Sequence, residues 1–406
     1  MITENNLEAI LRSLIEIDTS TPPGRNYRRI CEVIKELLEP TGCDISLLRT
    51  PSERVKKLVE QGEEISGERI NLIAKIKRGE GKTLILNGHI DVVPATGNWK
   101  HPPFDLISED NYWYGRGVAD MKGSLAGLIK VVQDLSSNDN WKGTVVLEAV
   151  CDEEIGGYTG TAYLHDTGFV KGDYCIVGDG YANNVTNAAN GCLRFKITVR
   201  GKSVHSSMNW RGINAVEKAS NLISQLESYN KVLNQRRSKV PANPETGVDF
   251  VTPSISIGTI RGGTKVNIIP DECFLEIDRR VGPQEDKDAA IIEFQRILDD
   301  LKSNDKDFNY DLHIGGFHDS FEIPENIEPI PTLKEAYRQV KGVSCPVYGG
   351  LGCYDAAHVA KHGIPVAVLG TSRVESNVHG IDERVRIRDV LDFTKIIETT
   401  SIKLLR

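Results

Sequence analysis

The sequence predicts a two-domain α/β protein, in which an α/β domain with helices around a central sheet is interrupted by a small ferredoxin-like domain. Three observations lead to this prediction. The chain has 406 residues, more than one ordinary hydrophobic core accommodates. Strand-like and helical stretches alternate in its first and last parts, as they do in α/β sheets. The middle part instead follows the order βαββαβ, the split βαβ plan of ferredoxin-like domains.

The predicted domain limits lie where this pattern changes. The larger domain takes up residues 1–188 and 317–406, and the inserted domain takes up residues 189–316. In the first part, apolar residues recur at helical spacing from Leu7 to Ile17, and the run Thr21-Pro22-Pro23-Gly24 ends that helix. The other elements predicted there are helices at Ile30–Leu38 and Gly123–Leu135 and strands at Leu72–Ile76, Thr83–Asn87, Thr144–Ala149 and Tyr174–Val177.

The inserted domain is predicted to begin with a strand at Leu193–Val199, because Phe195, Ile197 and Val199 alternate with polar residues. After Pro331 the α/β pattern returns. The remaining predicted elements of the insert are helices at Asn214–Leu233 and Gln284–Leu301 and strands at Ile255–Ile260, Cys273–Val281 and Phe308–Ile314; those of the last part are helices at Thr332–Val340, Ala356–His362 and Val390–Leu405 and a strand at Val366–Leu369.

Composition excludes several classes of protein. Hydrophobic residues make up 39% and charged residues 26% of the chain, which is typical of globular proteins. A net charge of −8 disfavours a nucleic-acid partner, which needs a basic surface. No apolar run approaches the ~20 residues of a membrane span, and no signal peptide is visible. The eight cysteines form no Cys-x-x-Cys pair, so we expect a reduced, cytoplasmic setting.

Polar side chains follow several predicted strands. His89 and Asp91 come after Thr83–Asn87; alternation puts both on one side, where Asp91 could orient a metal-bound His89. The alternative is a strand end with two polar residues for solubility. Asp120 lies among glycines before the helix Gly123–Leu135, and the alternative for it is a helix N-cap.

Three further segments carry ligand-type residues. Glu153 and Glu154 follow the strand Thr144–Ala149 and point in different directions, so one can bind a metal while the other moves protons. The alternative is a solvated acidic turn. Asp179 follows Tyr174–Val177, at the edge of an α/β sheet where ligands bind. His379 follows the last predicted strand, and alone it could be an ordinary loop histidine.

Taken together, these residues favour a metal site. Two histidines and three carboxylates lie at successive strand ends, with two further acids beside them. Mixed nitrogen and oxygen ligands suit zinc, and also cobalt or manganese. Two divalent ions that share one carboxylate would each have one histidine, one terminal carboxylate and room for a shared water, whose pKa falls toward neutrality.

The same segments resemble the M20 metallopeptidase family, which includes acetylornithine deacetylase, succinyl-diaminopimelate desuccinylase, aminoacylase and glutamate carboxypeptidase. The matching stretches occur in the family's order along nearly the whole chain. They are Gly88–Pro94, Trp99 with Pro103-Phe104, Gly115–Gly117, Asp120–Gly123, Glu153–Gly156, Gly201–Ser206, Asn267–Pro270, Asp278–Arg280 and His379–Glu383.

The resemblance implies a role for each site residue. The metal ligands would be His89, Asp120, Glu154, Asp179 and His379, with Asp120 bridging two ions. Asp91 would support His89, and Glu153 would be the general base that takes the proton from the attacking water. The insert would be a lid and dimerisation domain. There His205 would reach a neighbouring subunit's site and steady the oxyanion, and Asn267 and Arg280 would hold the substrate's carboxylate.

Arg280 also suits an amino-acid-like substrate on physical grounds, because a guanidinium is a planar fork that fits a carboxylate. The chain departs from the family at Asp179-Gly180, where Glu-Pro is common, and in the Gly349–Ala357 loop, which matches the glycine-rich substrate loop loosely. A shorter carboxylate still binds metal, so the departures affect the substrate more than the reaction.

We therefore predict a metal-dependent hydrolase that cleaves the amide of an N-acyl amino acid, a small molecule with a free carboxylate, and that forms a homodimer through the insert. The alternative within the family is a dipeptidase or carboxypeptidase. A non-catalytic relative is disfavoured because all five ligands and Glu153 are retained.

Overall fold

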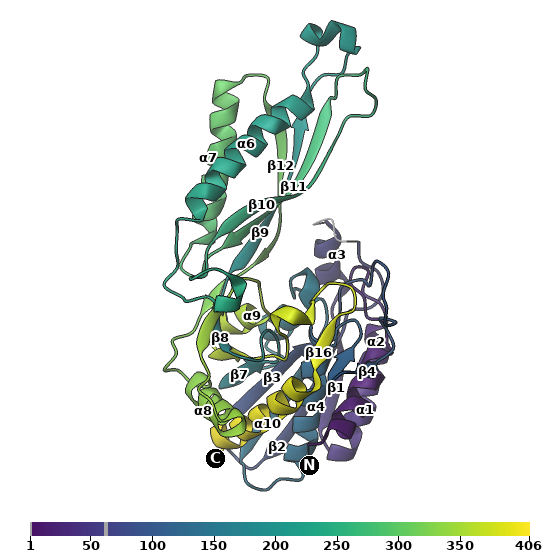
Figure 1. The fold of residues 1–406 in the computed structure, drawn as a ribbon, viewed down its shortest axis with the longest axis vertical. Coiled ribbons are helices and arrows are strands. Elements are labelled where there is room, and N and C mark those ends of the chain that lie inside the picture. Colours follow the sequence, from purple (N-terminus) through teal and green to yellow (C-terminus); the bar gives the residue numbers. More distant parts are fainter. Residues whose placement is uncertain (1, 61–63) are drawn as a thin grey trace.

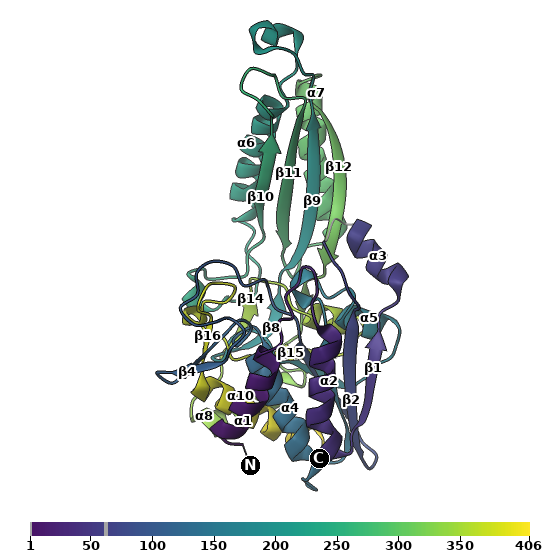
Figure 2. The same cartoon turned by 90° about the vertical axis from the view of Figure 1, so that its right-hand side faces the viewer.

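The computed structural model describes residues 2–60 and 64–406, and it confirms the predicted α/β class with a second, smaller sheet (Figure 1). The larger part, here the large domain, contains both chain termini at the end remote from the insert. The smaller part, here the inserted domain, projects from the other end as an elongated layer of strands and helices (Figure 2).

A nine-stranded mixed sheet forms the centre of the large domain. Its strand order is β1-β2-β6-β3-β7-β15-β8-β13, and β14 pairs with β8. The four central strands β6, β3, β7 and β15 run parallel to one another. Their carboxyl ends therefore lie at one edge. The strands are β1 (Asp44–Arg49), β2 (Ile70–Arg78), β3 (Thr83–His89), β6 (Gly143–Val150), β7 (Tyr174–Val177), β8 (Val185–Ala189), β13 (Phe321–Glu322), β14 (Val347–Gly350) and β15 (Val366–Val368).

Helices cover both faces of this sheet. The side with α4 forms the main core, where α4, buried along most of its length, packs against α1 and α10. α5 and α9 cover the other face with a smaller core. The helices are α1 (Glu4–Ile15), α2 (Tyr27–Leu38), α4 (Lys122–Ser136), α8 (Ile330–Lys341) and α10 (Ile387–Leu404) on the first side, and α5 (Thr161–Asp166) and α9 (Ala356–Ala360) on the second; α3 (Ser52–Glu60) lies apart.

The inserted domain has the predicted βαββαβ order. Its antiparallel sheet has the strand order β10-β11-β9-β12, and α6 and α7 cover one face (Figure 2). The stacked rings of Phe195 and Phe294, with centroids 3.9 Å apart, lie in that core. The elements are β9 (Gly191–Arg200), α6 (Ala215–Leu233), β10 (Ser254–Gly262), β11 (Glu272–Val281), α7 (Lys287–Asn304) and β12 (Asn309–His318).

Part of the insert returns to the large domain after α6. Ala242 forms a bridge with Gly349 of β14, and the Asn243 amide donates to Asn184 Oδ1 at 3.0 Å. Val240 packs against Ala188 nearby. These contacts, which the sequence patterns did not predict, tie the insert to the large domain beside the ends of the central strands.

A three-stranded sheet, β16-β5-β4, lies beside the large sheet. It joins β4 (Ile107–Glu109) and β5 (Tyr112–Tyr114) to β16 (Arg384–Arg386) near the C-terminus. All eight cysteines are free thiols. Within residues 2–60 and 64–406, no helix is long and apolar enough to cross a membrane.

Candidate metal centre and active site

The predicted metal ligands come together at the carboxyl edge of the central strands. His89 ends β3, Glu154 follows β6, Asp179 follows β7 and His379 follows β15. All except His89 line one cavity of about 760 Å³, together with Asp120. One nitrogen of His89 and one oxygen each of Asp120 and Glu154 lie within 4.8 Å of one another.

Asp120 lies between the two histidines. Its Oδ1 is 3.0 Å from His89 Nε2, and its Oδ2 is 3.3 Å from His379 Nε2. The N-cap of α4 is Met121, which makes no side-chain cap bond. The alternative role of Asp120 as a helix cap is therefore wrong, and its carboxylate has the placement of a bridging ligand.

The other two carboxylates flank this centre. Glu154 Oε2 is 3.1 Å from His379 Nε2, while its Oε1 is buried without a hydrogen-bond partner. Asp179 is buried and accepts a hydrogen bond from the main-chain N–H of Gly180. Burial and the nearby charge of Asp120 raise the pKa of Asp179 to about 7. An unsatisfied, negatively charged edge of this kind favours cations.

The raised pKa values of the two histidines indicate the same excess of negative charge at the site. Hydrogen bonds to Asp120 and Glu154 raise the pKa of His379 to about 10. Burial lowers the pKa of His89, but its hydrogen bond to Asp120 and the charge of Asp91 outweigh this effect, and the pKa lies well above its ordinary value. The carboxylates therefore hold protons on the imidazoles in the absence of other cations. Divalent ions fit this mixed nitrogen and oxygen donor set.

Asp91 supports the centre through both its main chain and its side chain. His89 Nδ1 is 2.9 Å from the main-chain oxygen of Asp91, whereas the Asp91 carboxylate is 3.8 Å away. That carboxylate instead accepts hydrogen bonds from the main-chain N–H groups of Glu153 and Glu154, at 3.3 and 3.1 Å. The Asp91 carboxylate is therefore within ion-pair distance of His89 rather than hydrogen-bonded to it, and it also fixes the turn that carries both glutamates.

The three consecutive acids after β6 point in different directions. Asp152 turns into the core, where it accepts hydrogen bonds from Arg69 Nε at 2.8 Å and from the Tyr27 hydroxyl at 2.6 Å. Glu153 and Glu154 both line the cavity. Burial raises the pKa of Glu153 well above its ordinary value, and the charge of Asp355 adds to this effect. The segment is not the solvated acidic turn of the alternative interpretation.

Glu383 holds the Asp120 loop in place, although no role was predicted for it. Its buried carboxylate accepts hydrogen bonds from the main-chain N–H groups of Gly117 (3.0 Å), Ala119 (3.0 Å) and Asp120 (3.2 Å) and pairs with Arg116 at 2.6 Å. The β16–β5 pairing brings the two segments together. The signal in the sequence was its place at the end of the His379–Glu383 stretch, just before β16.

The comparisons with known proteins agree with this centre. Residues 85–403 match the sequence model of peptidase family M20/M25/M40. The chain belongs to this family. It is 28% identical over 424 residues to a probable succinyl-diaminopimelate desuccinylase from Staphylococcus aureus, with 98% of this chain and 97% of that protein covered.

Solved structures of M20 proteins share the fold. An M20 family metallo-carboxypeptidase from Sulfolobus solfataricus superposes with a TM-score of 0.80 at 20% identity, covering 98% of this chain and 99% of that one. A tripeptidase from Staphylococcus aureus superposes with a TM-score of 0.78 at 22% identity, covering all of both chains. The protein is accordingly a metal-dependent hydrolase that acts on linear amide bonds.

The predicted residues of the insert divide between the two ends of its sheet. Arg280 lines the cavity of this M20 hydrolase, with its Nε 2.7 Å from Asp278 Oδ1. His205 and Asn267 lie beyond the far end of β9, where the Ser206 N–H donates to the Asn267 carbonyl at 3.0 Å. The length of β9 places them about 30 Å from the cavity end, at about 3.3 Å per residue. One chain therefore does not bring them to the metal ligands.

Proposed function

We propose that the protein removes the acyl group from an N-acyl amino acid that carries a free carboxylate, with two divalent ions at the edge of the central sheet. The observation that carries this proposal is the composition of the cavity wall. Carboxylates and His379 line one part of it, and the guanidinium of Arg280 lines another. Such a cavity matches a small substrate that has a scissile amide and an anionic group.

The donor set supports two ions that share Asp120. His89 and Asp179 would complete one ion's ligands, and His379 and Glu154 would complete the other's. Zinc is the proposed metal, with cobalt or manganese as alternatives. When bound, such ions polarise an amide carbonyl and lower the pKa of water. The main-chain oxygen of Asp91 fixes the ring of His89 for this purpose.

Glu153 is the proposed general base. It lines the cavity next to Glu154, and Asp91 fixes the main chain at both residues. Its raised pKa suits a group that accepts a proton from water and returns it to the leaving amine.

The substrate class follows from Arg280 and from the relatives. A guanidinium binds a carboxylate through two parallel hydrogen bonds, and Asp278 already orients the Arg280 side chain from one side. Relatives of similar length are named succinyl-diaminopimelate desuccinylases, which makes N-succinyl amino acids the first substrates to try.

We further propose that residues 189–316 act as a lid and as the contact surface of a homodimer. Exposed apolar side chains gather near His205 and Asn267: Trp210 is 76% exposed, and Val266 is fully exposed. Exposed apolar patches of this kind are typical of protein interfaces. Contact between two inserts would cover the patch and give His205 and Asn267 a route to the partner subunit's cavity.

A substrate panel tests the proposed reaction. N-succinyl, N-acetyl and N-formyl amino acids are assayed beside dipeptides, with zinc, cobalt or manganese added. We expect kcat/KM for at least one N-acyl amino acid to exceed that for every dipeptide. Turnover of dipeptides alone would replace the deacylase by the dipeptidase or carboxypeptidase alternative. No hydrolysis of either class by metal-loaded protein would contradict the proposal.

A further inference from the structure

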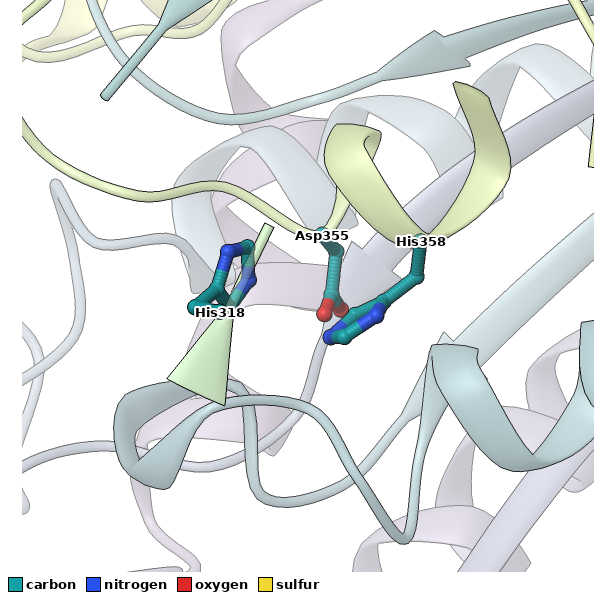
Figure 3. A group of neighbouring side chains, drawn as sticks. All are labelled: His318, Asp355 and His358. Atoms are coloured by element: carbon teal, nitrogen blue, oxygen red, sulfur yellow. The ribbon is translucent and has the colours of Figure 1, made fainter. Parts of the chain in front are cut away.

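A second group of potential metal ligands lies outside the proposed catalytic set. It consists of His318, Asp355 and His358, here the His318 cluster (Figure 3). One ring nitrogen of each histidine and one oxygen of Asp355 all lie within 4.8 Å of one another. All three residues are buried. None of them belongs to the matching stretches that contain the proposed metal ligands, although Asp355 lies in the Gly349–Ala357 loop.

Two atoms of the His318 cluster are buried without a partner. His318 Nδ1 lies 3.0 Å from the main-chain oxygen of Asp319. A carbonyl only accepts, so Nδ1 carries the hydrogen and Nε2 presents a lone pair. This Nε2 has no hydrogen-bond partner, and Asp355 Oδ1 has none either. The other Asp355 oxygen accepts from the Thr161 hydroxyl at 2.7 Å, which fixes the carboxylate.

Both imidazoles are neutral near pH 7, as metal ligands must be. Burial lowers the pKa of His318 to about 4, and it lowers the pKa of His358 to about 4 as well. Protonated histidine therefore does not supply the missing hydrogen to Asp355 Oδ1. The lone pair of His318 Nε2 and the Asp355 Oδ1 oxygen are thus both buried without a partner, an arrangement that costs free energy unless a cation is present.

The surroundings allow an ion to enter and to be held. His318 lines the 760 Å³ cavity, so solvent reaches one side of the cluster. His358 Nε2 is 2.9 Å from the carbonyl of Gly156; a cation at Nε2 would replace that hydrogen bond, and one at Nδ1 would keep it. Gly157 borders the cluster with a φ of +66°, and a side chain there would collide with Asp355 Oδ1.

We propose that His318, Asp355 and His358 bind a divalent transition-metal ion, zinc in the first place, that is separate from the catalytic ions. Two imidazoles and one carboxylate are a common ligand set for such ions, which bind at about 2.0–2.2 Å. His318 ends β12 of the insert, and Asp355 and His358 belong to the start of α9 and to α9 itself. The ion would therefore join the inserted domain to the large domain and fix the position of the lid.

The test counts ions rather than turnover. Full-length protein is loaded with zinc, desalted and analysed for metal by mass spectrometry, for the wild type and for His318→Asn. We expect His318→Asn to lose one ion per chain. The matched control is His362→Asn, a histidine just after α9 that pairs with Asp166 at the surface; it should lose none. Equal zinc content in the wild type and in His318→Asn would overturn the proposal.

A variant that lacks two of the proposed catalytic ligands separates the His318 cluster from the catalytic site. In His89→Ala/Glu154→Ala protein, the catalytic ligands are depleted, and one zinc ion should remain unless His358→Asn is added. Addition of zinc should also raise the melting temperature of this double variant. Absence of any tightly bound zinc there would contradict the His318 cluster, whereas failure of the double variant to change zinc content would contradict only the catalytic site.

If the His318→Asn and His358→Asn variants do not fold, cobalt titrated into the His89→Ala/Glu154→Ala protein tests the His318 cluster without them. A visible absorption band that saturates at one cobalt per chain supports the site. Titration without such a band overturns it.

Discussion

Two parts of the protein differ in where the predicted site residues lie. They are the carboxyl edge of the large sheet and the far end of the inserted domain. At the sheet edge, Asp120, Glu154, Asp179 and His379 face one cavity within a single chain. At the far end of the insert, His205 lies exposed beside an apolar patch and far from that cavity. We expect the first region to be complete within one chain, whereas the second would act on the same reaction only in contact with another molecule.

The difference reflects how each region is built. Parallel strands bring their carboxyl ends to one edge, so residues far apart in sequence meet without a partner. The insert is instead one long antiparallel sheet whose two ends are separated by the length of β9. Of the predicted site residues of the insert, Arg280 lies at the near end and lines the cavity. The following experiments test this division, in order of decreasing expected effect.

Metal removal should have the largest effect. Stripping the protein with a strong chelator should lower turnover by at least about 10³-fold, because bound ions contribute several kcal/mol to the barrier reduction. Elemental analysis confirms that the ions are gone, and zinc, cobalt or manganese is then restored. Full turnover in verified metal-free protein would show that the sheet edge is not a metal centre.

Variants of the adjacent Glu153 and Glu154 should differ in metal content. Glu153→Gln should keep its metal and lose about 10²–10⁴-fold in kcat, since it removes the general base alone. Glu154→Ala should lose turnover and also one ion, because Glu154 contacts His379. Metal content and kcat are measured on the same samples. If both variants lose the same amount of metal, the separate roles are wrong.

Mixed dimers test the far end of the insert. His205→Ala should lower kcat by about 10²–10³-fold, the usual cost of removing one oxyanion donor, with its metal retained. Mixing His205→Ala with Glu153→Gln subunits should then restore about a quarter of wild-type activity, because half of the twofold-symmetric dimers are hybrids and each has one intact site.

The contrary outcome is equally clear. If His205 acts within its own chain, every site in the hybrid carries a defect and the mixture stays inactive. A fully active monomer at the assay concentration would also contradict a cross-subunit role.

Much of the fold could be predicted because its patterns are local. The helices α1, α4, α6 and α10 and the strands of the insert follow apolar periodicity, which the sequence contains directly. β8 was missed because it is buried along its whole length and lacks alternation, and β14 was missed because it has only four residues. β1 and the α3 helix were missed too, and neither is deeply buried in the core.

The sequence predicts only those site residues that lie at strand ends or in the matching motifs. The predicted ligands His89, Glu154 and Asp179 lie at or soon after the ends of parallel strands, so their meeting follows from parallel pairing. Glu383 holds Asp120 through a pairing of β16 with β5 that no local pattern shows. The His318 cluster joins the end of β12 to α9, and nothing in the spacing of those segments indicates that they meet.

Substitution of Arg280 should give the smallest of these effects, and it should weaken substrate binding. Arg280 lies at the near end of the insert, where β11 pairs with Cys192 of β9, and it lines the cavity beside Asp120 and Glu154. Arg280→Ala should raise KM by about 10–100-fold, because hydrogen bonds to a charged group are worth about 1.5–3 kcal/mol and each 1.4 kcal/mol is tenfold. The metal content should not change, since no proposed ligand is touched.

The matched control is Lys196→Ala, a cation on neighbouring β9 that pairs with Glu276 away from the cavity; its KM should equal that of the wild type. A substrate analogue without the carboxylate sharpens the result, because it should be hydrolysed equally by the wild type and Arg280→Ala. A fall in kcat at constant KM would instead assign Arg280 to the transition state. The near end of the insert would then take part in the chemical step, and the division between binding at the insert and catalysis at the sheet edge would be lost.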